Sequence, residues 1–351
     1  QTPLRTPAPR GLPSPTAMPM SKPALVVAAA SGVALSVLAL KRLSDKGKSA
    51  RRLRCGEPVP PEWQVACAVI GGSGLYEMPG FTDQVEIEIE TPFGAPSDAY
   101  VLGKLDGVPV AFLSRHGRGH LKNPSEVNYR ANVYGLKRLG VRWILAVTAC
   151  GSLKMEIVPG EMVLIDQFID RTVQRPATFF CNGIAAHVPF ADPICPVASD
   201  CVRQACEELG VKHHVGGTYV NMEGPAFSTK AESEMHRSWG ASVIGMTNMT
   251  EARLAREAEM SMATIAMATD YDAWHPNHDA VTVEQVVKTA GENVDKAKKI
   301  ILKALPKLVA YAGPPPAAQT ALGGGGAIMT AKHKIPERLR RDLEPILGAY
   351  L

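Results

Sequence analysis

The chain has 351 residues, 46% of them hydrophobic, which is enough to bury a sizeable core in one large domain or two ordinary ones. The formal net charge of +4 owes much to a basic N-terminus, and no stripe of basic and aromatic residues follows it. This argues against a nucleic acid as partner and favours a small ligand. The seven cysteines show no CxxC or Cys/His spacing, which indicates reduced packing residues of an intracellular enzyme and not zinc ligands.

Residues 1–60 form an N-terminal extension that is rich in Pro, Ala and Ser. An apolar run from Ala24 to Leu40 precedes a basic cluster that begins at Lys41. The run is close to the shortest that spans a bilayer, about 17 residues, and the cluster behind it would stay cytosolic. The Arg-rich, acid-poor composition also fits a transit peptide. We leave open a membrane anchor at 24–40, an organellar transit peptide and an extension without a targeting role, and we expect the domain that follows in the cytoplasm.

Residues 61–310 have the composition of one globular domain. Apolar runs predict strands at Val65–Ile70, Val108–Leu113, Trp143–Thr148, Met162–Ile165, Thr218–Met222, Ser242–Met246 and Met262–Ala268. Stretches between several of them predict helices at Ser125–Leu139, Ser199–Leu209, Thr229–Arg237, Thr250–Ala258 and Thr282–Leu305. Because strands alternate with helices, we expect an α/β fold with a central mixed, largely parallel sheet flanked by helices.

Residues 311–351 begin with a linker composition, Pro314 to Pro316 and Gly323 to Gly326. They end in a short basic amphipathic tail. We expect a linker followed by a C-terminal tail that is at most a loosely docked helix.

The first predicted strand runs into a glycine-rich turn, Gly71 to Leu75. Glycines let the backbone approach an anion, and the Ser73 hydroxyl and free N–H groups can donate to it. The turn is not a GxGxxG motif, which argues against a dinucleotide site. A plain strand-to-loop turn is the alternative.

Two further strand ends offer donors. The second predicted strand ends in Ser114 to His120, where Arg115 and His116 stand beside glycines, and a guanidinium binds phosphate bidentately. The third ends at Thr148 with further hydroxyls and backbone amides. Three strand ends that offer donors to one acceptor, without a Walker lysine loop, favour inorganic phosphate over a nucleotide. For Arg115 and His116 an exposed basic loop is the alternative.

Three other segments carry candidate side chains, and two of these side chains have two interpretations each. Glu223 either binds ribose hydroxyls or braces its turn, and Phe227 either stacks on a base or packs in the core. Thr247 adds a hydroxyl where the next strand ends. His187 has no functional spacing, and a structural role fits it best.

The last predicted strand ends in Thr269-Asp270-Tyr271-Asp272. Residues two apart in a strand share a face, so both carboxylates project from the edge where an open α/β sheet binds its ligand. Two acceptors side by side suit an edge with an amino group and a protonatable nitrogen, such as that of adenine. Like charges so close also raise one pKa toward general-acid use. Two ordinary carboxylates in a solvated turn are the alternative.

Taken together, these motifs resemble the 5′-methylthioadenosine phosphorylases of the trimeric purine nucleoside phosphorylase class. The matching motifs are VIGGSGL, ETPFGAPSDAYVLG, SRHGRGH, VNYRANVYGLK, TACGSL, PGEMVLIDQFIDRT, MEGPAFSTKAES, WGASVIGMTNMTEARLAREAEM and IAMATDYDAW. The resemblance covers about residues 64–308 and implies a nucleoside phosphorylase-like fold and a homotrimer. The sequence departs from the family pattern at Ala226, where the family has Arg, and at Thr250, where the family has Pro.

The resemblance also implies a residue set. Phosphate would be held by Ser73, Arg115, His116, Thr148, the Ala149 amide and Thr247. Met246 would contact the ribose, and the purine would lie near Phe227 and Ser228 with Asp270 and Asp272 at its N7 and 6-amino edge. Val283 and His187 would line the 5′-methylthio pocket, with His187 reaching into a neighbouring subunit.

The implied reaction is phosphorolysis of S-methyl-5′-thioadenosine to adenine and 5-methylthioribose 1-phosphate, a pentosyl transfer in methionine and purine salvage. Asp270, paired with Asp272, is the candidate acid for the departing purine. Inorganic phosphate is a co-substrate, and we expect no metal or organic cofactor. Two alternatives stay open: a phosphorylase for 6-oxopurine nucleosides such as inosine or methylthioinosine, which paired carboxylates would repel, and a non-catalytic nucleoside-binding protein.

Overall fold

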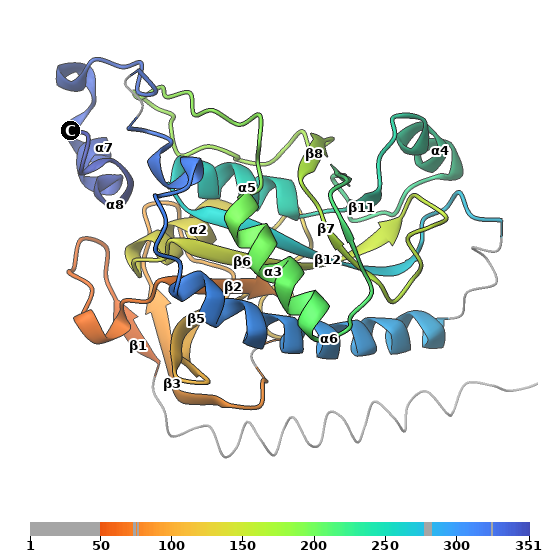
Figure 1. The fold of residues 1–351 in the computed structure, drawn as a ribbon. Coiled ribbons are helices and arrows are strands. Elements are labelled where there is room, and N and C mark those ends of the chain that lie inside the picture. The colour runs from red at the N-terminus through yellow and green to blue at the C-terminus, as the bar shows by residue number, and fades with distance from the viewer. Residues whose placement is uncertain (1–49, 73–74, 76, 277–282, 324–325) are drawn as a thin grey trace, which may run out of the picture. The chain divides into compact units, whose positions relative to one another are not determined.

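The apolar runs of the sequence form strands of one large mixed sheet (Figure 1). The computed structural model describes residues 50–351 except 73–74, 76, 277–282 and 324–325. Residues 50–351 form one unit, and the apolar run at 24–40 lies outside the described residues. Among the helices that are described, none is both long and apolar enough to cross a membrane.

The described chain contributes twelve strands to the sheet. They are β1 (Arg51–Leu53), β2 (Cys67–Gly71), β3 (Phe81–Ile89), β4 (Tyr100–Leu105), β5 (Val108–Ser114), β6 (Trp143–Ser152), β7 (Met162–Leu164), β8 (Gln167–Asp170), β9 (His213–Val215), β10 (Thr218–Asn221), β11 (Val243–Gly245) and β12 (Ser261–Tyr271). The order is β1-β3-β4-β5-β2-β6-β11-β10-β8, with β12 pairing with β6 and β7, and β7 with β9. The pairs β5–β2, β2–β6, β6–β12, β11–β10 and β10–β8 are parallel, whereas β3–β4, β4–β5, β6–β11 and β7–β12 are antiparallel. The expected mixed, largely parallel sheet is confirmed.

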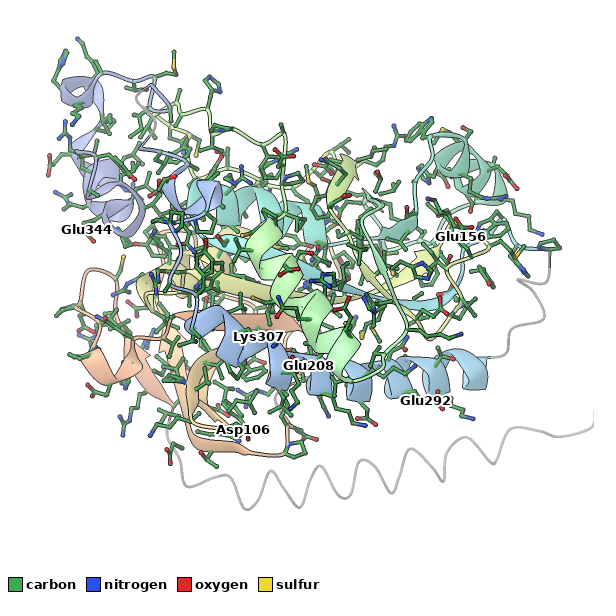
Figure 2. All side chains as sticks on the ribbon, in the orientation of Figure 1. Asp106, Glu156, Glu208, Glu292, Lys307 and Glu344 are labelled. Carbon is green, nitrogen blue, oxygen red and sulfur yellow. The ribbon has the colours of Figure 1, made fainter. Side chains whose placement is uncertain are left out.

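Helices cover both faces of this sheet. They are α2 (Tyr129–Arg138), α3 (Pro196–Glu208), α4 (Lys230–Ser238), α5 (Asn248–Glu257), α6 (Val283–Val309), α7 (Glu337–Asp342) and α8 (Glu344–Leu347), with short 3-10 turns at Pro61–Trp63, Ala317–Thr320 and Lys332–Lys334. Helices α3 and α6 pack on each other against one face, and α2 and α5 pack on the other (Figure 1). Lys307 on α6 and Glu208 on α3 form an ion pair of 2.6 Å between the first two helices (Figure 2).

The continuous apolar run of β2 follows from burial on both faces. Ala68 and Ile70 belong to the core cluster under α2 and α5, whereas Cys67 and Val69 belong to the cluster under α3 and α6. All four side chains are 0% exposed. A strand covered on both faces needs no polar alternation, and for this reason its sequence is apolar throughout.

Local sequence sets where the helices begin. Asn128 accepts a hydrogen bond from the Ala131 N–H at 3.2 Å and caps α2, so this helix begins at Tyr129 and not at Ser125. Helix α4 begins with a capping box in which the side chains of Thr229 and Glu232 each accept from the other's backbone N–H.

The folded unit is larger than the expected domain of residues 61–310. Strand β1 pairs with β3, and Arg138 on α2 donates to the carbonyls of Arg54 at 2.9 Å and Glu57 at 2.6 Å. The unit therefore includes residues that we assigned to the N-terminal extension.

The C-terminal segment is also docked. Leu343, Ile346 and Leu347 are 3% exposed or less and join the core cluster of α2 and α5. The Tyr350 hydroxyl donates to the carboxylate of Glu259 at 2.8 Å. Residues 311–351 are thus part of the fold and not a linker with a loose tail, because apolar side chains of this segment pack in the core cluster.

Candidate active site

The carboxyl ends of β2, β5 and β6 meet at one edge of the sheet. Gly71 of β2 lies beside Ser114 of β5, and the Arg115 N–H donates to the Gly71 carbonyl at 2.9 Å. In the same register Ile70 lies beside Ala146 of β6. The three strand ends that were predicted to share an anion are therefore neighbours. Ser73 itself lies outside the described residues.

Arg115 is buried at this edge and joined to α5. Its Nε and Nη2 donate to the two carboxylate oxygens of Glu251 at 2.5 and 2.8 Å, and its Nη1 donates to the Val147 carbonyl at 2.9 Å. The two charged side chains are 3% and 2% exposed, so this is a buried bidentate ion pair. Since an arginine has five N–H groups, these contacts leave one on each Nη for a ligand. An exposed basic loop is excluded for Arg115.

His116 lies next in the chain with its ring half-buried. Its Nδ1 is 2.9 Å from the Lys122 carbonyl, which only accepts, so Nδ1 carries the proton of the neutral ring and Nε2 is an acceptor. Burial, together with the charge of Arg115, lowers the pKa of His116 to about 4, although the hydrogen bond to Lys122 acts in the opposite direction. The ring stacks on His120 with centroids 4.2 Å apart. At neutral pH, His116 is therefore uncharged.

Thr148 and Thr247 come to the same edge from two further elements. Thr148 follows Val147, whose carbonyl receives Arg115, and Thr247 is the N-cap of α5, one turn before Glu251. Strand β11 runs antiparallel to β6, with Val243 opposite Ser152 and Ile244 opposite Gly151, so the chain after β11 runs back along β6 and brings Thr247 toward Thr148. The N-terminal end of α5, with its partial positive charge, thus faces this edge. Ala149 follows on β6 and is exposed.

The two acids of the last strand converge at Gly151. Asp270 lies opposite Gly151 in the β12–β6 ladder, after a bulge at Thr269. The Thr269 hydroxyl donates to Asp270 Oδ1 at 2.7 Å. A Cβ on Gly151 would lie 3.3 Å from the Cβ of Asp272, so a larger residue here would push this side chain away by a few tenths of an ångström.

The two carboxylates differ in burial. Asp270 is partly exposed, whereas Asp272 lies just beyond the end of β12 and is 7% exposed. Asp272 Oδ2 is buried without a hydrogen-bond partner among the described residues. A buried acceptor without a donor is costly, which is the state that a ligand amino group would relieve. The alternative of two ordinary solvated carboxylates is excluded for Asp272.

Glu223 braces its loop. One carboxylate oxygen accepts from the N–H groups of Val173 at 2.6 Å and Gln174 at 3.2 Å, and the other accepts from Arg175 Nε at 3.0 Å. Burial opposes ionisation of this carboxyl, but these donors outweigh it and lower its pKa. Of the two interpretations for Glu223, the structure shows the structural one.

The neighbouring substrate candidates lie around this braced loop. The Met246 carbonyl accepts from Arg175 Nη1, and a Cβ on Gly224 would lie 2.6 Å from the Met246 sulfur, so the Met246 side chain packs on the loop. Ser228 Oγ lies 3.9 Å from the Met222 sulfur. Phe227 is 84% exposed, which excludes the core interpretation.

The described chain does not bring His187 to this edge. His187 is exposed, and its N–H donates to the Ala327 carbonyl at 2.8 Å beside the C-terminal segment. In Figure 1 the C-terminal helices α7 and α8 lie on the opposite side from α4, the helix that directly follows Phe227 and Ser228 in the chain. Val283 is the first residue of α6, and its side chain lies outside the described ones.

Two residues that the sequence analysis missed organise the edge. Glu251 orients Arg115, and Arg175, 1% exposed in its side chain, joins Glu223 to the Met246 carbonyl and the Tyr129 hydroxyl. Glu251 reads in the sequence as an ordinary acid in the first turn of a helix, and Arg175 as one basic residue of a polar loop. Neither carries a local signal for its partner.

Comparison with known proteins agrees with this geometry. The pattern that defines the Phosphorylase superfamily matches residues 66–306. An S-methyl-5′-thioadenosine phosphorylase of Koribacter versatilis is 51% identical over 290 residues, covering 82% of this chain and 97% of that protein. The protein of that name from Geobacter sulfurreducens is 53% identical over 284 residues, covering 81% and 98%.

A solved methylthioadenosine phosphorylase from an Antarctic soil metagenomic library is 47% identical with a TM-score of 0.77, covering 81% of this chain and 99% of that one. The Schistosoma mansoni methylthioadenosine phosphorylase in complex with tubercidin is 37% identical with a TM-score of 0.66, covering 71% and 93%. The chain therefore belongs to the phosphorylase superfamily and, within it, to the S-methyl-5′-thioadenosine phosphorylase family.

Proposed function

We propose that this chain catalyses the phosphorolysis of S-methyl-5′-thioadenosine to adenine and 5-methylthioribose 1-phosphate. The observation that supports this most is the pairing of two sites on one sheet edge. Arg115 and the N-terminus of α5 offer donors for an anion, and the buried acceptor of Asp272 beside Asp270 offers a place for an amino group. Two relatives named S-methyl-5′-thioadenosine phosphorylase also support the proposal, since they are 51% and 53% identical to this chain over 97% and 98% of their own length.

In this proposal phosphate is bound by Ser73, Arg115, His116, Thr148, the Ala149 amide and Thr247. A phosphate oxygen bonds to the anomeric carbon while the bond from that carbon to adenine breaks. The phosphate charge stabilises the cationic ribosyl group in the transition state. Phosphate is a co-substrate, and the reaction needs no metal or organic cofactor.

The nucleoside is bound by Met246, Phe227, Ser228, Asp270, Asp272, Val283 and His187. Asp270 protonates N7 of the leaving purine, and Asp272 accepts from its 6-amino group. A carbonyl at position 6 would instead face a carboxylate, which disfavours 6-oxopurine nucleosides. As the resemblance to the family implies, His187 serves the site of a neighbouring subunit in a homotrimer, and its exposed place beside the C-terminal segment supports this role.

The test is release of the free base measured by chromatography with and without phosphate, as adenine from methylthioadenosine and as hypoxanthine from methylthioinosine. We expect release from methylthioadenosine only when phosphate is present. Release without phosphate would indicate a hydrolase, preference for methylthioinosine would indicate the 6-oxopurine alternative, and binding without release would indicate a non-catalytic protein.

Two variants connect the activity to the anion donors. Arg115→Lys keeps the charge but loses the guanidinium fork, and should raise the KM for phosphate on the order of ten- to a hundredfold, because a hydrogen bond to a charged group contributes about 1.5–3 kcal/mol. Arg118→Ala is the matched control, since Arg118 lies in the same segment but is 39% exposed and pairs with Glu86. Equal phosphate KM values in both variants would remove Arg115 from the site.

A further inference from the structure

The buried cations at the anion edge are already neutralised by the protein. Arg115 pairs with Glu251 through two contacts of 2.5 and 2.8 Å. Arg175 pairs with Glu223 at 3.0 Å, and its side chain is 1% exposed. Each guanidinium thus has its own carboxylate, and the two pairs sum to no net charge. A phosphate dianion that entered this edge would therefore bring two negative charges without a free buried cation to meet them among the described residues.

His116 does not supply a charge in this state. Its Nδ1–H is committed to the Lys122 carbonyl at 2.9 Å, which leaves Nε2 with a lone pair. The groups that act on the ring are Arg115 at the end of β5, His120 in its own segment and Arg175 after β8, and each of them disfavours a proton on it. Without ligand the ring is neutral, and its Nε2 would meet a fully ionised phosphate oxygen as one acceptor meets another.

We propose that phosphate and a proton bind together at this edge, with the proton taken from solvent by Nε2 of His116. The new N–H bond turns Nε2 from an acceptor into a donor toward a phosphate oxygen. It also places one positive charge against the dianion, which favours the charged ring once the anion is present. This inference rests on the proposed function, because it takes phosphate to be the co-substrate.

The fixed tautomer is what makes His116 suited to this role. Because Nδ1–H is held by a backbone carbonyl, a second proton can only enter at Nε2, so protonation changes one atom and leaves the ring orientation unchanged. The stacked ring of His120, 4.2 Å away and 18° from parallel, also restrains the plane of His116. His116 Nε2 therefore becomes a hydrogen-bond donor of fixed orientation only when an anion binds.

Linkage gives the size of the effect. The unliganded ring loses its proton near pH 4, and the liganded ring keeps it to higher pH. Between these two values anion binding takes up one proton, so anion affinity should fall about tenfold for each unit of rising pH.

The probe is sulfate, which has the shape of phosphate but does not titrate in this range, so any proton taken up from solvent must bind to the protein. Titration calorimetry of sulfate into the full chain, in two buffers with different ionisation enthalpies, counts the protons directly. At pH 6 we expect close to one proton taken up per sulfate, with affinity falling about tenfold from pH 6 to pH 7. Zero protons, affinity that does not change with pH, or no binding from pH 5 upward would overturn the inference.

Two variants give an independent test. His116→Gln offers a permanent N–H donor and should bind sulfate with an affinity that no longer depends on pH. His120→Asn is the matched control, since Asn tolerates the positive φ of 57° at this position, and it should keep the wild-type slope. If His116→Gln keeps the wild-type slope, another group takes up the proton and the inference fails; if it does not fold, the proton count on the wild type decides.

Adenine release at saturating phosphate reports the proposed function separately. An enzyme that releases adenine but shows no proton uptake with sulfate overturns this inference alone. An enzyme that releases no adenine with phosphate overturns the proposed function.

Discussion

Glu251→Ala is predicted to destabilise the chain strongly, because it leaves the buried charge of Arg115 without its partner. Removing one side of a buried ion pair costs about 3–5 kcal/mol. The upper part of that range applies here, since both side chains are nearly inaccessible, at 3% and 2% exposed, and two hydrogen bonds are lost together. Domains are stable by about 5–15 kcal/mol, so the variant should still fold.

Urea unfolding followed by tryptophan fluorescence measures this loss. With a slope of about 3 kcal/mol per molar urea, a loss of about 4–5 kcal/mol should lower the midpoint by roughly 1.3–1.7 M. Glu292→Ala is the control, because it removes an exposed partner of Lys288 on α6 (Figure 2) and should leave the midpoint unchanged.

Two further comparisons separate charge from packing. Replacing both partners, Arg115→Met with Glu251→Leu, should cost less than Glu251→Ala alone, because no buried charge is left unpaired. Sulfate should also stabilise Glu251→Ala more than the wild type, since an anion can meet the freed guanidinium. If Glu251→Ala unfolds within about 0.3 M of the wild-type midpoint, the pair does not hold Arg115 and the reasoning fails.

Four other predictions concern separate parts of the molecule. Asp270→Asn should depress kcat for methylthioadenosine by on the order of 10²–10⁴-fold, and Asp272→Asn should mainly raise its KM and narrow the preference over methylthioinosine; wild-type specificity constants in both variants would contradict the assignment. Gly151→Ala would place a Cβ 3.3 Å from Asp272 Cβ and 3.3 Å from Ile244 Cγ2, and should raise the nucleoside KM severalfold without changing that for phosphate; an equal rise in both would point to general distortion. Burial raises the pKa of Glu257 to about 7, against hydrogen bonds from the Phe179 N–H and the Thr178 hydroxyl, so the folded state binds the extra proton and should lose stability as pH rises from 4.5 to about 7. Glu257→Gln should flatten that part of a plot of urea midpoint against pH, and an unchanged slope would exclude this carboxyl as the cause. A chain that starts at Ala50 should unfold at the midpoint of the full chain, whereas one that starts at Glu57 loses β1 and should unfold earlier; equal midpoints would show that β1 contributes nothing.

Local patterns predicted the centre of this fold well. The apolar runs at Val65–Ile70 and Trp143–Thr148 became β2 and β6, since strands covered on both faces need continuous apolar sequence. The peripheral strand β3 was missed because its sequence, from Phe81 to Ile89, mixes exposed and buried positions. The C-terminal docking was missed because α7 and α8 are too short for a clear helical period.

The candidate site was predictable where it lies at strand ends and not where it depends on distant partners. Arg115, Thr148 and Asp272 follow apolar runs, and parallel strands bring such ends together. The ion pair of Arg115 with Glu251 spans 136 residues of sequence, and no periodicity encodes a contact of that kind. The neutral state of His116 likewise depends on burial and on Lys122, which a motif cannot show.

Strand β6 holds an unusual place in the sheet, since it pairs with β12 along its length, with β2 from Trp143 to Ala146 and with β11 at its end. Its backbone amides are therefore among the most protected of the chain, and their exchange with solvent deuterium requires opening of the sheet interior. The segments that carry His116 and Phe227 are loops, whose amides open locally. Deuterium labelling would accordingly divide the site into a slow half, with Thr148 on an interior strand, and a faster half, with His116 and Phe227 on loops.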